Sequence, residues 1–224
     1  MQSRKSLKAF VITLENHAYS EACAARCIDS AQGIEIERFR AVTADEVGND
    51  TLYRCELVWS WMDSGQCPNT SLHFHRYGGS NARIACALSH YFLWQLCVRE
   101  GPLLILEHDA VFVRPFEPFE FDSICQINDP RGATPNGAWW SDEMVKRGPG
   151  VWPKTKIFDD RRPDGLAGNS AYVIKPEAAD HMIELAHRVG LWPNDALMCR
   201  QLVPNLQELY PFMTRVEQTE STTT

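Results

Sequence analysis

The ten residues LLILEHDAVF (103–112) constrain the fold of this chain more than any other stretch. Four large apolar residues come first, which is typical of a strand buried on both faces of a sheet. A strand of that kind needs helices on both sides, so the segment predicts an α/β fold. Two acids, Glu107 and Asp109, follow where the strand ends. Ligands of open α/β sheets bind at the carboxyl ends of strands, so we expect these acids in a binding site.

The spacing of the two acids indicates a metal site. Alternate residues of an extended chain point to the same side, which would bring both carboxylates together. Oxygen ligands of this kind suit Mg²⁺ or Mn²⁺, whose other positions go to water and phosphate oxygens. The chain carries a net charge of −7, so a dication would help it to hold an anionic diphosphate. The competing interpretation is a strand end whose acids are solvated or paired with arginine.

Composition excludes several classes of protein. The chain has 224 residues, of which 44% are apolar and 23% charged, as in an ordinary globular domain and unlike a fibrous or disordered chain. The acidic balance argues against nucleic-acid binding. There is no run of eighteen apolar residues, so we expect no membrane span. The apolar stretch near the N-terminus is short and runs into Glu15, unlike a signal peptide, so we expect a cytoplasmic protein.

We expect one domain over residues 1–224, with an ordered core at 7–215 and a frayed, Thr-rich tail at 216–224. The eight cysteines form no CxxC pair, and we expect buried, reduced thiols in place of disulfides or a zinc site.

The element pattern alternates strands and helices. A strand, a helix and a second strand predict a parallel unit at the N-terminus. The region 125–168 is expected to be rich in loops, which usually serve a function when they are this long. The other expected elements are strands over 9–14, 34–42, 103–106, 110–113 and 170–174, and helices over 18–31, 81–99 and 176–190, with a short helix after 192–195.

Four segments together resemble a known family. They are FVITLENH with IEIERFRAVTADE (10–46), ARIACALSHYFLW (82–94), LLILEHDAVF (103–112) and LAGNSAYVIKPEAADHMIELA (166–186). Their order and spacing are similar to glycosyltransferase family 25, the lipooligosaccharide-type galactosyltransferases related to collagen galactosyltransferases. The resemblance implies a GT-A-like (Rossmann-like) nucleotide-sugar-binding sheet with flanking helices. It also implies a divalent cation at an Asp-x-Asp-like motif, and inverting transfer to a hydroxyl.

One residue of the acid motif departs from the family pattern. His108 stands where the family has an aspartate. An imidazole could still hydrogen-bond the ribose or bind a metal, but it does not supply the same negative charge. The resemblance therefore implies a lower metal affinity here, and Asp109 and Glu107 remain the expected metal ligands.

The donor site is expected where the first two strands and the helix over 81–99 converge. The nucleoside should lie beside the turns after the two strands, with Arg83 on a phosphate and His90 on the sugar or metal. The competing interpretations are a satisfied core histidine and, for the late Gly-Asn pair, a turn that enters a strand. The predicted donor-binding residues are Thr13, Leu14, Glu15, Asn16, Ala41, Val42, Thr43, Arg83, Ser89, His90, Glu107, His108, Gly168 and Asn169.

Inverting transfer needs a base near the acceptor hydroxyl. Asp195 in WPNDALM (192–198) is similar in position to a family aspartate that follows the late helix, and it is the predicted catalytic base. The alternative is that Asn194 or Asp195 caps a short helix. Weaker rivals for the base are Asp159, Asp160 and Asp164, which lie in a charged segment more typical of a solvated loop.

The predicted activity is transfer of a hexose to a hydroxyl of a glycan or protein, and we expect the hexose to be galactose from UDP-galactose. We expect the loops 60–80 and 136–166 to form the acceptor site, in which Trp139, Trp140 or Trp152 could stack on a sugar. The alternative, prompted by His108, is a non-catalytic sugar- or nucleotide-binding module. A nicotinamide enzyme is disfavoured because no Gly-x-Gly-x-x-Gly loop follows the first strand.

Overall fold

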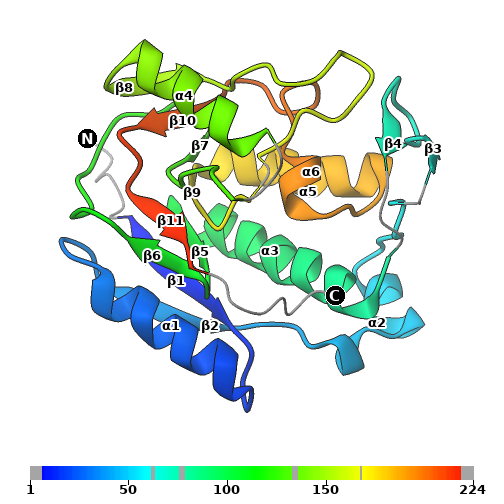
Figure 1. Ribbon diagram of the computed structural model, residues 1–224. Helices are drawn as coiled ribbons and strands as arrows, with labels where there is room; N and C mark the ends of the chain where they lie inside the picture. The colour runs from blue at the N-terminus through cyan, green and yellow to red at the C-terminus, as the bar shows by residue number, and fades with distance from the viewer. Residues whose placement is uncertain (1–6, 62–63, 76–78, 133–135, 167, 218–224) are drawn as a thin grey trace, which may run out of the picture.

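The computed structural model describes residues 7–61, 64–75, 79–132, 136–166 and 168–217. A seven-stranded sheet runs through the molecule in the order β2-β1-β5-β9-β7-β10-β8 (Figure 1). Five strands run in one direction, and β9 and β8 are antiparallel to their neighbours. The bounds in sheet order are Ile36–Arg40, Lys8–Thr13, Leu103–Glu107, Ala171–Ile174, Ile124–Gln126, Leu206–Tyr210 and Gly150–Pro153. This mixed, mostly parallel sheet with flanking helices confirms the predicted fold class.

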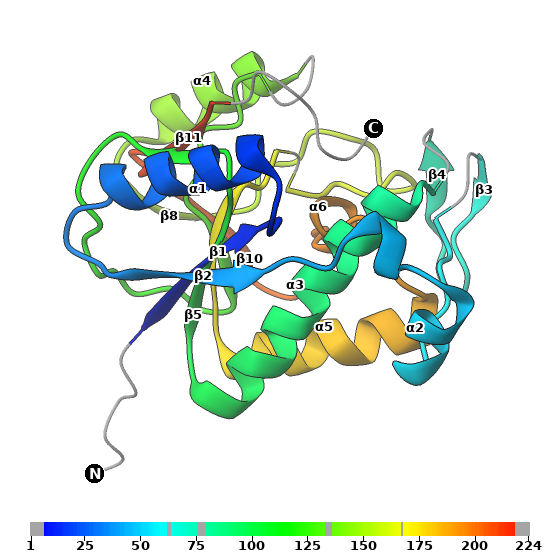
Figure 2. The ribbon, with the colours of Figure 1, turned by 90° about the horizontal axis from the view of Figure 1, so that it is seen from below.

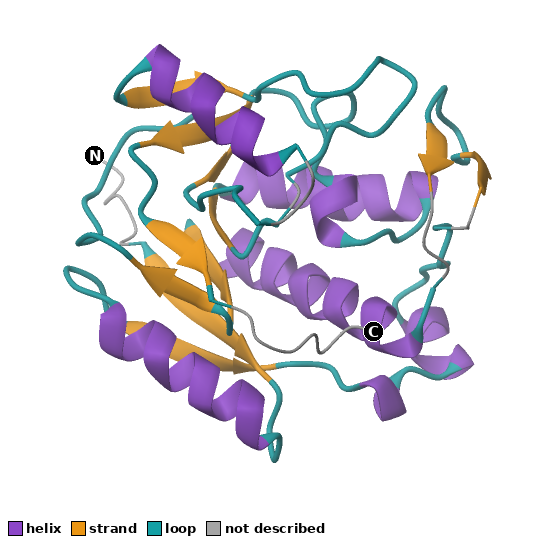
Figure 3. Cartoon of the chain, viewed as in Figure 1, coloured by secondary structure: helices purple, strands orange, loops and turns teal. Residues whose placement is uncertain are grey.

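Helices cover both faces of the sheet (Figures 2 and 3). On one side α3 packs against α5, and on the other α1 packs on β1 and β6. None of the helices in the described ranges is both long and apolar enough to cross a membrane. The helices are α1 (Ala18–Ser30), α2 (Asn49–Arg54), α3 (Asn81–Glu100), α4 (Gly137–Arg147), α5 (Pro176–Val189), α6 (Asn194–Leu197) and the 3₁₀ turn η1 (Ala44–Glu46).

The two faces of the central strands explain their continuous apolar sequence. In β5, Leu103 and Ile105 join the core formed with α3 and α5, whereas Leu104 and Leu106 join the core formed with α1. All four side chains are fully buried. Successive side chains of a strand point to opposite faces, so a sheet covered on both sides needs an apolar residue at every position.

Two small sheets complete the fold. β11 (Thr214–Val216) pairs antiparallel with β6 (Ala110–Phe112), and β3 (Ser64–Gln66) pairs with β4 (His73–His75). Val216 therefore belongs to a strand and not to the predicted frayed tail, of which residues 218–224 lie outside the described residues. The backbone N–H of Glu217 donates to the carbonyl of Asp109 at 2.9 Å, so the C-terminal strand is fastened beside the acid motif.

The prediction of a loop-rich region over 125–168 is wrong in part. It contains most of β7, all of α4 and all of β8. α4 has no side-chain hydrogen bond at its N-cap and begins with Gly137. Its stability comes from the burial of Trp140 and Met144 and not from local propensity, which a sequence pattern does not reveal.

A buried ionic cluster fastens the loop between β8 and β9. The ammonium of Lys154 lies 3.4 Å from Glu208 Oε1, 3.7 Å from Asp164 Oδ1 and 3.9 Å from the centroid of the Trp140 ring. Arg200 Nε donates to the other oxygen of Asp164 at 2.9 Å. Burial lowers the pKa of Lys154, and the two carboxylates oppose that shift. Asp164 is fully buried in this cluster, so it is neither a solvated loop residue nor a rival catalytic base.

Candidate functional site

Two cavities meet at the carboxyl ends of β1 and β5, and they share Cys86 and Glu107 in their walls. We call them the β1 cavity, of about 320 Å³, and the acidic cavity, of about 490 Å³. The β1 cavity is lined by Ile12, Leu14, Glu15, Asn16, His17, Ala41, Val42, Thr43, Ala44, Ala82, Ala85, Cys86, Ser89, Glu107 and His108. The acidic cavity is lined by Arg83, Cys86, Glu107, Asp109, Arg131, Gly132, Gly168, Asn169, Ser170, Pro193, Asn194, Asp195 and Val216.

The turns after β1 and β2 form the β1 cavity, as expected for neighbouring parallel strands. Thr13 O accepts a hydrogen bond from Ala41 N at 2.9 Å, and Val42 N donates to Ser89 Oγ at 2.9 Å. These bonds connect β1, the second turn and α3. Thr13 itself is buried, with its hydroxyl donating to Val11 O, and it does not line this cavity. Thr13 instead lines a separate cavity with Glu15 and Asn16, so its contact with a donor stays a prediction.

Asn16 closes the first turn. Its backbone has a φ of +60°, a conformation that asparagine tolerates better than most residues, and its N–H donates to Glu21 Oε1 at 2.9 Å. Leu14 N donates to Ser20 Oγ at 3.0 Å, so both ends of this turn are fastened to α1. The turn is consequently well defined where it lines the cavity.

The two acids of the motif face the same cavity, as their spacing predicts. Glu107 ends β5 with 31% of its side chain exposed, while Asp109 is 5% exposed. Among the described residues, Asp109 Oδ1 has no hydrogen-bond partner. Burial, followed by the negative charge of Glu107, raises the pKa of Asp109 to about 7. A buried, unpartnered carboxylate oxygen beside a second carboxylate fits the ligand set of a divalent cation.

His108 faces the β1 cavity, away from the acidic cavity. Its ring lies edge-on to Tyr19 with centroids 6.1 Å apart, and its buried Nε2 has no hydrogen-bond partner in the described parts of the chain. Burial lowers the pKa of His108, which favours a neutral imidazole. His108 therefore contributes a buried imidazole to the wall of the β1 cavity.

The donor contact predicted for His90 is corrected by its burial. The imidazole is fully buried and lines neither cavity. Its Nδ1 lies 2.9 Å from Tyr172 Oη, and its Nε2 lies 3.3 Å from Glu107 Oε1. His90 is therefore not placed to contact a donor sugar, and its contacts towards the acidic cavity are with Glu107. Its neighbour Ser89 is also buried and serves as the partner of Val42 N.

A second set of potential metal ligands overlaps the first. Single ligand atoms of Cys86, His90 and Glu107 all lie within 4.8 Å of one another. Cys86 and His90 are four residues apart on α3 and so share a face of the helix. Burial and three nearby carboxylates raise the pKa of the Cys86 thiol well above its usual value. This disfavours a free thiolate without a bound cation.

Two arginines line the acidic cavity. Arg83 comes from α3, as predicted. Arg131, which the sequence analysis missed, follows β7 and donates from Nε to Asp129 Oδ2 at 2.8 Å. The sequence pattern did not indicate β7 as a strand. A prediction of β7 would have placed Arg131 near the carboxyl end of a strand and so among the candidate site residues. Together the two guanidinium groups bring positive charge to a cavity that otherwise contains three carboxylates.

Asp195 lies on the wall of the acidic cavity, half-buried, in the short helix α6. The N-cap position of α6 is Pro193, so neither Asn194 nor Asp195 occupies it. Burial, followed by the charge of Glu107, raises the pKa of Asp195 to about 6. Gly168 and Asn169 line the same cavity, and Asn128 Nδ2 donates to Gly168 O at 2.8 Å, which fixes that turn.

The loop that the ionic cluster fastens also positions Asp195. Leu166 N donates to Asp195 O at 2.8 Å, and a Cβ atom on Gly165 would lie only 2.0 Å from that same oxygen. No side chain fits at position 165 unless the backbone of Asp195 moves. The close contact is therefore specific to glycine.

Since Asp195 is the catalytic base predicted from the sequence, we expect Gly165→Ala to lower turnover by roughly 100-fold, because displacement of such a group by about 1 Å costs that much. Steady-state kinetics measure the loss. Gly148→Ala is the control, since it strains a positive φ of +79° at the end of α4, outside both cavities. It should lower the melting temperature and leave kcat unchanged. Equal kcat in Gly165→Ala and wild type would show that Asp195 is not held by this contact.

The remaining predicted candidates lie outside the two cavities. The carboxylate of Asp160 is 71% exposed and pairs with Lys156 and Arg200, and Asp159 accepts from backbone N–H groups of its own loop. Trp140 is buried and is thereby excluded from stacking on an acceptor, whereas Trp139 is 47% exposed.

Comparison with known proteins identifies a family for the chain. Residues 6–132 match the family described as glycosyltransferase family 25 (LPS biosynthesis protein). No curated protein matches the chain. Similar solved structures include the WbbM bifunctional glycosyltransferase, with 10% identity and a TM-score of 0.44, over 92% of this chain and 39% of that one. Mouse xyloside xylosyltransferase 1 has 10% identity and a TM-score of 0.42, over 86% and 80% of the two chains.

The family match spans more than half of the sequence. It includes the turns of the β1 cavity, the helix that carries Arg83 and the acid motif at the end of β5. The fourth segment of the resemblance, over 166–186, lies beyond the matched residues. The chain belongs to glycosyltransferase family 25.

Proposed function

We propose that this protein transfers a hexose from a nucleotide sugar to a hydroxyl of a glycan or protein, with inversion at the anomeric carbon, and that UDP-galactose is the donor. One observation carries the proposal: the β1 cavity shares Glu107 and Cys86 with a second cavity, which is lined by the carboxylates of Glu107, Asp109 and Asp195. A mainly apolar pocket for a base thus adjoins a charged pocket for a diphosphate and a sugar.

The two cavities suggest how the donor would bind. The apolar side chains of Leu14, Val42 and Ala85 suit the faces of a nucleobase, and the imidazole of His108 would lie beside the ribose. The diphosphate would then lie where the cavities meet, and the hexose would lie in the acidic cavity near Gly168 and Asn169.

Asp109 and Glu107 would hold the divalent cation, which we propose to be Mn²⁺ or Mg²⁺. When bound, the cation neutralises negative charge on the diphosphate. Arg83 and Arg131 add positive charge to the same cavity, which stabilises a departing nucleoside diphosphate. His108 adds no negative charge to the motif, so we expect cation affinity to be lower than a motif with three acids would give.

Asp195 would act as the base. Its carboxylate accepts the proton of the acceptor hydroxyl as that oxygen forms a bond to the anomeric carbon. The bond between the anomeric carbon and the diphosphate oxygen breaks, and the nucleoside diphosphate leaves with that electron pair. A single displacement of this kind inverts the configuration. A base whose pKa is raised to about 6 is ionised at neutral pH and still basic enough to accept a proton.

We expect kcat/KM to rise with pH through an apparent pKa of about 6 and then to level off, because only the ionised form of Asp195 accepts a proton. A pH profile of kcat/KM for the acceptor, with the donor saturating, measures this limb. The Asp195→Asn variant should retain a small activity without the limb. A wild-type profile that stays flat across this range would rule out Asp195 as the titrating base.

A thermal-shift panel of nucleotide sugars, with and without Mn²⁺, tests the proposal as a whole. UDP-galactose with Mn²⁺ at about 100 times its Kd should raise the melting temperature by roughly 5 °C or more. Release of UDP in the presence of an acceptor then distinguishes the enzyme from a non-catalytic binding module, for which His108 is the motivating observation. If no nucleotide stabilises the protein, the donor site is assigned wrongly.

A further inference from the structure

We propose that Trp94, Tyr172 and His90 form a buried hydrogen-bond chain that fixes the orientation of Glu107. His90 acts here as a positioning residue, and Trp94 and Tyr172 act through it. The proposal rests on the proposed function only for what Glu107 does once it is held. The existence of the chain and the direction of its hydrogen bonds are independent of that function.

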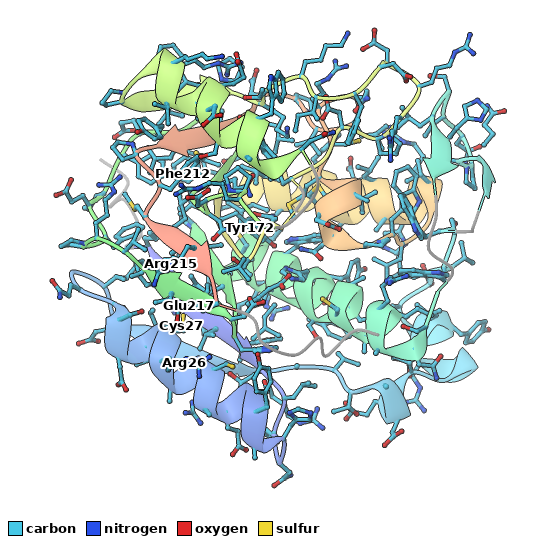
Figure 4. All side chains as sticks on the ribbon, viewed as in Figure 1. Arg26, Cys27, Tyr172, Phe212, Arg215 and Glu217 are labelled. Atoms are coloured by element: carbon cyan, nitrogen blue, oxygen red, sulfur yellow. The ribbon has the colours of Figure 1, made fainter. Side chains whose placement is uncertain are left out.

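The hydrogen-bond chain runs from the core to the cavity wall through three hydrogen bonds. Trp94 Nε1 lies 3.0 Å from Tyr172 Oη, Tyr172 Oη lies 2.9 Å from His90 Nδ1, and His90 Nε2 lies 3.3 Å from Glu107 Oε1. Trp94, Tyr172 and His90 are fully buried, whereas Glu107 reaches both cavities. Figure 4 shows Tyr172 near the centre of the molecule.

Three elements bring these groups together. His90 and Trp94 are one turn apart on α3, so both side chains point towards the same part of the sheet. Tyr172 projects from β9 on the face that packs against α3, and its ring stacks on His90 at an interplanar angle of 24°. Glu107 ends β5, which pairs with β9. The hydrogen-bond chain is therefore built from the packed elements α3, β9 and β5.

The donor and acceptor chemistry sets the direction of the bonds. An indole N–H only donates, so Tyr172 Oη accepts from Trp94 and has its own hydrogen to donate. The nearest acceptor is His90 Nδ1, which must then be unprotonated. A neutral imidazole in this tautomer carries its proton on Nε2 and donates it to Glu107.

This direction has a consequence for the carboxylate. One oxygen of Glu107 accepts from His90, which restricts rotation of the carboxylate and leaves the other oxygen for a ligand. The alternative use of the same nitrogen is as a ligand for a thiophilic cation held with Cys86 and Glu107. That use requires Nε2 to be unprotonated, so the two arrangements predict opposite tautomers of His90.

Nitrogen NMR of histidine-labelled, metal-free protein distinguishes the tautomers. We expect His90 to carry its proton on Nε2 and to have an unprotonated Nδ1. In Tyr172→Phe, Nδ1 of His90 loses its hydrogen-bond donor. The chemical shifts of the two ring nitrogens should then approach each other as the tautomers mix. Tyr91→Phe is the matched control, because Tyr91 is also on α3 and its hydroxyl lies 3.1 Å from Nε2 of His187. That variant should leave the His90 signals unchanged.

Cation binding provides a second readout. In Mn²⁺ titrations followed by electron paramagnetic resonance, without donor, Tyr172→Phe should weaken binding by roughly 10-fold, as loss of an outer hydrogen-bond partner does. Tyr91→Phe should bind as wild type does. If wild type binds no Mn²⁺, the metal part of the proposed function fails. The tautomer of His90 then remains as the test of the hydrogen-bond chain.

Trp94→Phe keeps the test decisive if Tyr172→Phe does not fold, since it removes only the first donor. This variant should change the chemical shifts of the His90 nitrogens in the same direction as Tyr172→Phe does, but by a smaller amount. A wild-type His90 with its proton on Nδ1, with both nitrogens protonated, or with signals indifferent to loss of the Tyr172 hydroxyl would overturn the proposal.

Discussion

Replacement of Asp109 by asparagine is expected to abolish cation-dependent transfer and, at the same time, to stabilise the metal-free protein. The loss of transfer should reach roughly 1,000-fold or more in kcat/KM, because a group that holds charge at the reacting centre is removed. Asparagine has nearly the same shape and fills the same buried space. The expected loss is therefore one of charge and not of folding.

The gain in stability follows from the direction of the pKa shift. Burial and Glu107 raise the pKa of Asp109 to about 7 in the folded state, above the usual value of 3.8. The folded protein thus binds this proton more tightly than the unfolded chain, and the associated stability is lost as the pH rises through about 7. At about pH 8 the asparagine variant should have a free energy of unfolding larger by on the order of 2 kcal/mol.

Kinetics with Mn²⁺ and denaturant unfolding at two pH values measure the two effects of Asp109→Asn. The stability gain should vanish below about pH 3, where the wild-type carboxyl is protonated in both the folded and the unfolded state. Asp160→Asn is the control, because Asp160 is exposed and lies outside both cavities. It should change neither quantity much. If Asp109→Asn retains wild-type transfer, or if it unfolds more readily at about pH 8, the assignment of Asp109 is wrong.

Replacement of Asp195 by asparagine is expected to have the second largest effect. Loss of the base should lower kcat by roughly 1,000-fold, within the range that general-base catalysis contributes. Binding of UDP with Mn²⁺ should stay within a few-fold of wild type, since Asp195 is not one of the proposed cation ligands. This separation of turnover from binding is the signature of a residue that acts on the acceptor.

The rival aspartates supply the comparison for Asp195. Asp159→Asn and Asp160→Asn alter exposed loop carboxylates and should leave kcat unchanged. Calorimetric titration of UDP with Mn²⁺ and initial-rate kinetics are sufficient for all three variants. A kcat for Asp195→Asn within tenfold of wild type, or a larger loss in either loop variant, would move the catalytic base elsewhere.

The sequence pattern predicted the first half of the fold well because its elements have strong local signals. β5 is a continuous apolar run, and α3 begins at the N-cap Ser80, whose hydroxyl accepts from Arg83 N, and ends at Gly101 with a φ of +116°. By contrast, α4 depends on the burial of Trp140 against Lys154, which lies in the loop after β8. Short strands such as β7 and β8 are stabilised by neighbours distant in sequence, and such contacts leave no local pattern.

The candidate site was predictable where it depended on strand direction alone. Glu107 and Asp109 follow the carboxyl end of a strand, and ligands of open α/β sheets bind at that edge. This inference needs no knowledge of the neighbouring side chains. The role of His90 was not predictable, because it depends on Tyr172, 82 residues further along the chain. Asp164 was misread for a similar reason, since its partner Arg200 is 36 residues away.

The position of a bound cation tests the central claim most directly. Crystals soaked with Mn²⁺ and UDP, with diffraction recorded at the manganese absorption edge, would locate both ligands. The account predicts an anomalous peak in contact with Asp109 and Glu107, with the uracil against Leu14 and Val42 in the β1 cavity. A peak that touches neither carboxylate, or a nucleotide bound outside both cavities, would contradict it.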